Sequence, residues 1–167
     1  SSAHSGNNYF YFETSTGGGT TGTIVTPAID LISASNDAEI SFWIHAFGAT
    51  IGTLDVGIST SNSGPFTNIY SQSGQLQTAS GDPFQNVSIN IASYIGQQVY
   101  VSFTYTRGSS FTGDIAIDLV EVLSCFNCPG PSNLQAFNLT GFSADISWTA
   151  SGAANDWNYW YHQKGLH

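Results

Sequence analysis

Short stretches in which apolar and polar residues alternate recur along this chain, and turns rich in Gly, Ser and Asn separate them. Such alternation over four to eight residues indicates a β-strand with one buried face. Helical periodicity is almost absent. Strands are predicted at residues 9–14, 23–26, 39–47, 53–59, 68–71, 84–91, 97–105 and 115–122, with one helical turn over 92–96. The pattern predicts an all-β sandwich of antiparallel strands.

The composition narrows the class of protein. A length of 167 residues suits one domain with a small appendage. Only 8% of the residues are charged, and Ser, Thr, Asn, Gln and Gly take their place at the surface, which favours a secreted β-protein. A net charge of −9, with one Lys and one Arg, excludes ordinary nucleic-acid binding and disfavours anionic membranes. Because no run of 18 apolar residues occurs, no membrane insertion is expected.

The stretch from Tyr100 to Val122 predicts two strands joined by a Gly/Ser turn, and it contains the only Arg, Arg107. In the second strand, alternation places Ile115, Ile117 and Leu119 on one face and Asp118 on the other. Asp118 is flanked by apolar residues, and a buried carboxylate needs a cation or several hydrogen-bond donors. The sequence leaves two alternatives for the partner of Asp118: Arg107 or a metal ion.

The two cysteines, Cys125 and Cys128, stand in the segment SCFNCPGP, where the composition changes. A C-x-x-C pair forms a redox site, half a zinc site or a short disulfide. We favour a disulfide, or partners outside this sequence, because neither a second ligand pair nor a helix follows. Residues 124–132 are therefore predicted to be a linker, and residues 133–167 a second segment whose part up to Ala150 contains two strands.

Four blocks occur in order along the first part of the chain: HSGNNYFYFETS, TPAID, ISFWIHAFGATIGTLDVGIS and VSFTYTRGSSFTGDIAIDLVEV. Together they resemble a MAM domain over roughly His4 to Val122. The resemblance implies an extracellular, non-catalytic jelly roll over residues 1–123 that serves adhesion, self-association or ligand binding. That family has an opening segment with further strands before the position of His4, which the sequence does not contain. Residues 125–148 resemble the start of a fibronectin type III domain, with Trp148 as its core tryptophan.

The MAM resemblance also implies candidate metal ligands. Members of the family often carry acids at the positions of Glu13 and Asp118, and some bind a cation, so Ca²⁺ held by Glu13, Asp118 and Asp114 is one interpretation. The alternative is a buried ion pair between Arg107 and Asp118, with Glu13 hydrogen-bonded and no metal. Arg107 is also a candidate anion-binding residue.

Aromatic side chains supply the other candidate site. Tyr9, Tyr11, Trp43 and Tyr105 are candidates for a platform on which sugar rings stack, and Asn, Gln and Thr are abundant around them. The alternative is that these rings fill the core. His45 lies in the middle of a predicted strand among aromatics, and we expect it to be a core histidine.

The functional hypothesis is a secreted, non-catalytic module. We expect a carbohydrate-binding accessory domain of a larger secreted bacterial protein, whose partner is a polysaccharide or a cell-surface glycan. The alternative is a protein–protein adhesion module that self-associates through an open strand edge. A glycan-active enzyme is a third, distant hypothesis, since neither a hydrolase motif nor a carboxylate pair is indicated by spacing. The parent protein is expected to be a hydrolase or a protease.

Overall fold

The computed structural model describes residues 3–15, 20–126, 132–140 and 143–149. The chain divides into two compact units, Ser1–Phe126 and Asn127–His167. Among the described residues, no helix has the length and apolar character needed to cross a bilayer.

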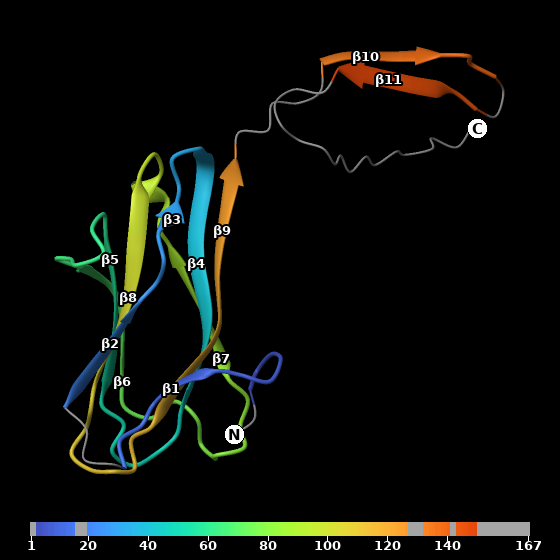
Figure 1. The fold of residues 1–167 in the computed structure, drawn as a ribbon. Coiled ribbons are helices and arrows are strands. Elements are labelled where there is room, and N and C mark those ends of the chain that lie inside the picture. The colour runs from blue at the N-terminus through green and yellow to red at the C-terminus, as the bar shows by residue number, and fades with distance from the viewer. Residues whose placement is uncertain (1–2, 16–19, 127–131, 141–142, 150–167) are drawn as a thin grey trace. The chain divides into compact units, whose positions relative to one another are not determined.

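The first unit consists of two antiparallel sheets (Figure 1). The first sheet has the order β1-β9-β4-β7, formed by Phe10–Phe12, Ile115–Phe126, Ala34–Ala46 and Gln85–Asn90. The second has the order β2-β8-β5-β6, formed by Thr21–Val25, Gln98–Thr106, Thr53–Ser59 and Thr67–Ser73. Strand β3 (Ile29–Asp30) also pairs with β8, beyond the end of β2. Pro27 separates β2 from β3 because proline has no N–H for the ladder.

Counted with β2 and β3 as one interrupted strand, the eight described strands of the first unit have the strand order of a jelly roll, in which consecutive strands change sheet except at the β5–β6 hairpin. The predicted all-β jelly-roll sandwich is therefore confirmed. All of these strands lie within Phe10–Phe126.

Alternating side chains from both sheets fill the space between them. Strand β4 contributes Ile40, Phe42 and Ile44, each with no exposed surface. The ring of Phe42 meets that of Phe103 on β8 edge to face, with centroids 5.2 Å apart and planes at 90°. The core is completed by the inward residues of β5, β8 and β9, namely Leu54, Val56, Ile58, Val99, Val101, Ile115 and Ile117. The outward-facing residues of the same strands form the outer surfaces of the two sheets.

A β-bulge in β9 changes the predicted faces of that strand. Trp43 on β4 pairs with Asp118, but Ser41 pairs with Glu121, so two residues of β9 oppose one of β4. Leu119 has a φ of 45° and is 37% exposed. The expectation that Leu119 lies inward with Ile115 and Ile117 is therefore wrong, because the extra residue shifts the alternation by one.

Gly52 and Gly113, which belong to the last two of the four sequence blocks, lie in two loops that are joined by one tyrosine. The hydroxyl of Tyr105 accepts a hydrogen bond from the backbone N–H of Gly52 at 2.8 Å and donates one to the carbonyl oxygen of Gly113. A Cβ on Gly52 would lie 1.9 Å from the carbonyl oxygen of Thr106, so a larger residue does not fit there. The side chain of Tyr105 therefore connects the two loops through hydrogen bonds.

The second unit contains an antiparallel hairpin of β10 (Ser132–Phe137) and β11 (Asp145–Thr149). The two strands predicted between residues 133 and 150 are thus present. Trp148 lies in β11 and is 38% exposed. Strand β9 continues to Phe126, so residues 124–126 belong to the first unit and not to the predicted linker. Cys128 and the tail from residue 150 onward lie outside the described residues, as does the side chain of Cys125.

Candidate functional site

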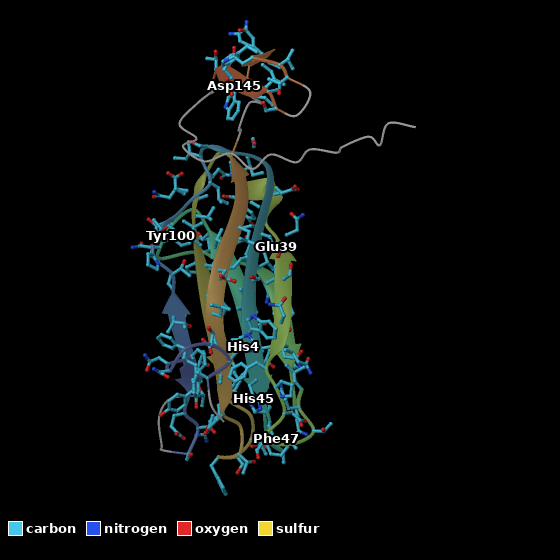
Figure 2. All side chains as sticks on the ribbon, turned by 90° about the vertical axis from the view of Figure 1, so that its right-hand side faces the viewer. His4, Glu39, His45, Phe47, Tyr100 and Asp145 are labelled. Carbon is cyan, nitrogen blue, oxygen red and sulfur yellow. The ribbon has the colours of Figure 1, made fainter. Side chains whose placement is uncertain are left out.

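The outer face of the first sheet carries an aromatic cluster. Register places Trp43 opposite Asp118, and His45 opposite Ala116, all on the face turned away from the core. The N-terminal segment lies against this face: the imidazole of His4 stacks on the indole of Trp43, with centroids 3.6 Å apart. Figure 2 shows His4, His45 and Phe47 toward the same end of the first unit, and Glu39 toward the other.

Phe84, just before β7, connects these rings. Its ring centroid lies 6.2 Å from that of His4, 6.1 Å from that of Tyr9 and 5.3 Å from that of His45. Tyr9 in turn lies 6.2 Å from Tyr11, which extends the cluster to strand β1. We call this set the outer aromatic cluster; its members are His4, Tyr9, Tyr11, Trp43, His45 and Phe84.

The loop between β6 and β7 borders the cluster, and Gln77 fixes it to β4. The β4–β7 ladder ends at Ile44. Beyond that point the Gln77 side chain takes the place of a strand: its Oε1 accepts from the N–H of Ala46 at 2.7 Å, and its Nε2 donates to the carbonyl of Ile44 at 3.3 Å. Nε2 also donates to the carbonyl of Pro83 at 3.2 Å. Gln77 is 3% exposed, so this network is buried and holds the loop that carries Ser80.

A concave site of about 270 Å³ opens where these elements meet. Its floor is formed by His45, Ile115 and Ala116, and the remaining residues that line it are Tyr9, Tyr11, Phe47, Ser80 and Asp114. We call it the tyrosine pocket. Tyr11 is 56% exposed. A second hollow of about 260 Å³, lined in part by His4, Asp82 and Phe84, adjoins it through Ser80.

Two titratable side chains give the pocket its polarity. His45 is 7% exposed, and its Nε2 is buried without a hydrogen-bond partner among the described residues. Burial lowers the pKa of His45, and the charge of Asp82 together with a hydrogen bond to its backbone only partly offsets this effect. Asp114 accepts hydrogen bonds from the backbone N–H and the hydroxyl of Thr14, both at 2.8 Å on Oδ1. The pocket therefore combines ring faces, a carboxylate and a neutral imidazole.

The structure brings together part of the predicted aromatic platform. Tyr9 and Tyr11 line the pocket together with Asp114, which the sequence suggested only as a metal ligand. Trp43 belongs to the same cluster, where His4 covers one face of its indole. Tyr105 is 2% exposed and lies in the core, so its inclusion in the platform was wrong. His45 is buried as expected, but it lies on the outer face of the first sheet. Its position two residues after Trp43 in the same strand could have indicated from the sequence that the two side chains share a face.

Asp118 is bonded to backbone donors and not to the predicted side chain of Arg107. Its Oδ2 accepts from the N–H of Ser5 at 3.0 Å and its Oδ1 from the N–H of Leu119 at 2.7 Å. Burial alone would raise the pKa of Asp118, but backbone hydrogen bonds from Ser5, Leu119 and His4, together with the charge of His4, hold this pKa below its ordinary value. The predicted ion pair with Arg107 is therefore wrong, and backbone donors stabilise the carboxylate instead.

The three predicted calcium ligands are not gathered in this structure. Among the described residues, no group of three or more His, Cys, Asp or Glu side chains could hold a metal ion. Asp114 and Asp118 are four residues apart on extended backbone, a separation of roughly 13 Å, whereas Ca²⁺ ligands lie about 2.3–2.6 Å from the ion. Glu13 is exposed and accepts from the N–H of Ser15 at 2.7 Å. These residues do not fit one shared site in this structure, and the calcium hypothesis is left to a melting experiment with EDTA.

Comparison with models of known protein families finds no match. Among solved structures, the chain is similar to the K1 cleaved adhesin domain of Lys-gingipain from Porphyromonas gingivalis W83. The two are 20% identical, with a TM-score of 0.54, over 71% of this chain and 75% of the adhesin domain. At this level of identity the likeness shows only that the two chains share an antiparallel β-sandwich fold.

Proposed function

We propose that the first unit is a non-catalytic carbohydrate-binding module that binds its ligand in the tyrosine pocket. The observation that carries the proposal is the meeting of ring faces and polar acceptors in one concave site. Tyr9, Tyr11 and Phe47 supply the rings, and Asp114 with Ser80 supplies the polar groups. Ligand sites are typically concave and largely apolar, with a few polar groups that fix orientation.

The chemistry of sugars matches this arrangement. A pyranose ring has C–H groups on its faces and hydroxyl groups around its edge. Its faces can pack against Tyr9 and Tyr11, while an edge hydroxyl donates to the carboxylate of Asp114. Tyr11 is already more than half exposed, so a ligand reaches it without unfolding any element.

Two features support a binding role without catalysis. Asp114 is the one carboxylate that lines the pocket among the described residues, whereas most glycosidases use two carboxyl groups on either side of the bond they cleave. Glu39 and Glu121 lie on the outer face of the first sheet, beyond the bulge from the pocket. The distant hypothesis of a glycan-active enzyme is therefore not favoured.

The context that we propose is a larger secreted bacterial protein. The similar structure is an adhesin domain of a bacterial gingipain, and the MAM resemblance suits an extracellular accessory module. The low content of charged residues suits the same location.

Affinity electrophoresis in gels that contain soluble polysaccharides tests the proposal. We expect one or more neutral or amine-bearing polysaccharides to retard the chain, and Tyr11→Ala to abolish the retardation. Tyr100→Ala is the matched control, because Tyr100 lies on β8 in the second sheet (Figure 2) and should leave binding unchanged. Equal retardation of both variants, or retardation by no polysaccharide, would contradict the proposal.

Self-association is a second candidate function, and the free edge of β9 favours it. Strand β1 pairs with β9 only over Ile115–Ile117, so in the described part of the chain the later residues of β9 pair with β4 alone. Leu119 and Val120 beside this edge are 37% and 43% exposed. Antiparallel pairing of two copies about Val122 would place Glu121 opposite Leu123, so like charges would not face each other.

Sedimentation velocity over a range of protein concentrations tests this second candidate. We expect a dimer that Val120→Lys converts to a monomer, because a lysine on an exposed edge strand opposes edge-to-edge pairing. A wild-type chain that stays monomeric at all concentrations would exclude it.

A further inference from the structure

The tyrosine pocket combines three hydroxyl groups, which donate and accept hydrogen bonds, with the carboxylate of Asp114 and the imidazole of His45. The Nε2 atom of His45 is buried with no partner among the described residues, while the imidazole forms a hydrogen bond with the backbone of Asp82. A neutral imidazole that donates from one ring nitrogen presents a lone pair on the other. Because the Nε2 atom has almost no exposed surface, His45 offers a ligand neither a donor nor a positive charge from that nitrogen.

Asp114 adds a negative charge at the same site. Both hydrogen bonds from Thr14 reach its Oδ1, and among the described residues no hydrogen bond is recorded at Oδ2. The residues that line the pocket include no Lys or Arg, and the net charge of the whole chain is −9. An anionic ligand would meet repulsion there and find no cationic partner.

The aromatic rings that line the tyrosine pocket favour a ligand with a positive charge. Tyr9, Tyr11 and Phe47 line the pocket together with Asp114. The faces of aromatic rings are electron-rich and attract cations, and the attraction increases as the cation loses water. Aromatic faces beside a carboxylate are therefore an environment for an ammonium group.

We infer that the tyrosine pocket selects a sugar unit that carries a free amine, and that it rejects uronic, sialic and sulfated sugars. The inference rests on the proposed carbohydrate-binding function and names its ligand class. The sugar ring packs on Tyr9 and Tyr11, and the ammonium group pairs with Asp114. The volume of about 270 Å³ is below the range of roughly 300–1,000 Å³ for drug-sized ligands, so it suits one sugar unit at a time.

Isothermal titration calorimetry with four β-1,4-linked oligomers tests the inference. Their units are glucosamine, N-acetylglucosamine, glucose and glucuronic acid, and the titrations are made near pH 6, where the amine is largely protonated. We expect the glucosamine oligomer to bind at least about fivefold more tightly than the glucose and N-acetylglucosamine oligomers, the scale of one partly exposed ionic and cation–π contact. The glucuronic acid oligomer should bind most weakly.

Two variants separate the pocket from the overall charge of the chain. Asp114→Asn keeps an acceptor for the Thr14 N–H and removes the charge, so it should bring the affinities for glucosamine and glucose oligomers together. Glu121→Gln removes the same charge from an exposed residue that does not line the pocket, and should keep the preference. An equal loss in both variants would show attraction by bulk charge and overturn the inference.

The remaining outcomes distinguish the inference from the function on which it rests. If the neutral or acidic oligomers bind as tightly as the glucosamine oligomer, and Tyr11→Ala abolishes that binding, the inference is wrong and the carbohydrate-binding function stands. If none of the four oligomers binds and no polysaccharide retards the chain, both fail.

Discussion

The imidazole of His4 and the indole of Trp43 stack almost in parallel, with centroids 3.6 Å apart and an angle of 15° between the planes. This contact holds the N-terminal segment against the outer face of the first sheet. The same segment provides the Ser5 N–H that donates to Asp118, and a few residues later it provides Tyr9 for the pocket. One wall of the candidate site therefore depends on a contact between residues 39 positions apart in the chain.

Replacement of His4 should loosen this segment. We expect His4→Ala to lower the free energy of unfolding by about 0.5–1.5 kcal/mol, the range for an aromatic pair beyond its buried area. Urea denaturation measures this change. His4→Phe keeps a flat ring over Trp43 and should retain most of the stability, so equal losses in the two variants would show that stacking is not the cause.

Asp118 should make stability depend on pH in the acid range. Because the pKa of Asp118 is lower in the folded protein than its ordinary value of 3.8, the folded state favours the ionised form. Its contribution is complete above the ordinary value and is lost as the pH falls through the lower, folded value. Asp118→Asn places an amide N–H₂ against the donors of Ser5 or Leu119 and should cost about 1–3 kcal/mol at pH 7.

Urea denaturation of both proteins at pH 7, 5 and 3 tests this account of Asp118. The difference in unfolding free energy between wild type and Asp118→Asn should be constant from pH 7 to pH 5 and smaller at pH 3. A difference that stays the same at pH 3 would mean that the ionised carboxylate is not what the backbone donors stabilise.

Gln77 should affect both stability and ligand binding. Gln77→Leu keeps the approximate size but leaves the N–H of Ala46 and the carbonyls of Ile44 and Pro83 without their partner, which should cost about 2–3 kcal/mol. The loop that carries Ser80 should then move, and polysaccharide affinity should fall. Gln75→Leu is the matched control: its exposed Oε1 accepts only from the N–H of Gly48, at 3.1 Å. If both variants behave alike, the assigned role of Gln77 is wrong.

Calcium binding is tested by thermal melting with EDTA and with added calcium, at a fixed protein concentration. A cation that binds only the folded state would raise the melting temperature. Because Glu13, Asp114 and Asp118 each accept hydrogen bonds within the protein, we expect the melting temperature to be unchanged by EDTA. A fall with EDTA that calcium reverses would establish a site, and Asp114→Asn and Asp118→Asn would then locate it.

The sequence predicted best where one face of a strand is buried and the other is not. The strand at Thr53–Ser59 has the predicted bounds because Leu54, Val56 and Ile58 all point into the core. The bulge at Leu119 could not be predicted in this way. It depends on the register between β4 and β9, which are far apart in the sequence, and it decides which residues of β9 face outward.

In the candidate site as well, some features follow from the sequence and others depend on how the strands pair. Tyr11 and Tyr105 are both aromatic residues in strands, and the sequence alone does not separate them. Pairing of β1 with β9 turns Tyr11 to the outer face, whereas Tyr105 on β8 points into the core and bridges two loops. One of the donors to Asp118 is the backbone N–H of Ser5, 113 residues away, and no side-chain pattern indicates such a donor.

The measurement that tests the tyrosine pocket most directly is an NMR titration of the ¹⁵N-labelled chain with a glucosamine oligomer, followed by backbone amide shifts. We predict saturable shifts at Tyr11, His45, Ser80 and Ile115, with the amides of the second sheet around Tyr100 unchanged. Shifts confined to the β9 edge or to the β10–β11 hairpin, or no shifts at millimolar oligomer, would contradict the assignment of this pocket as the ligand site.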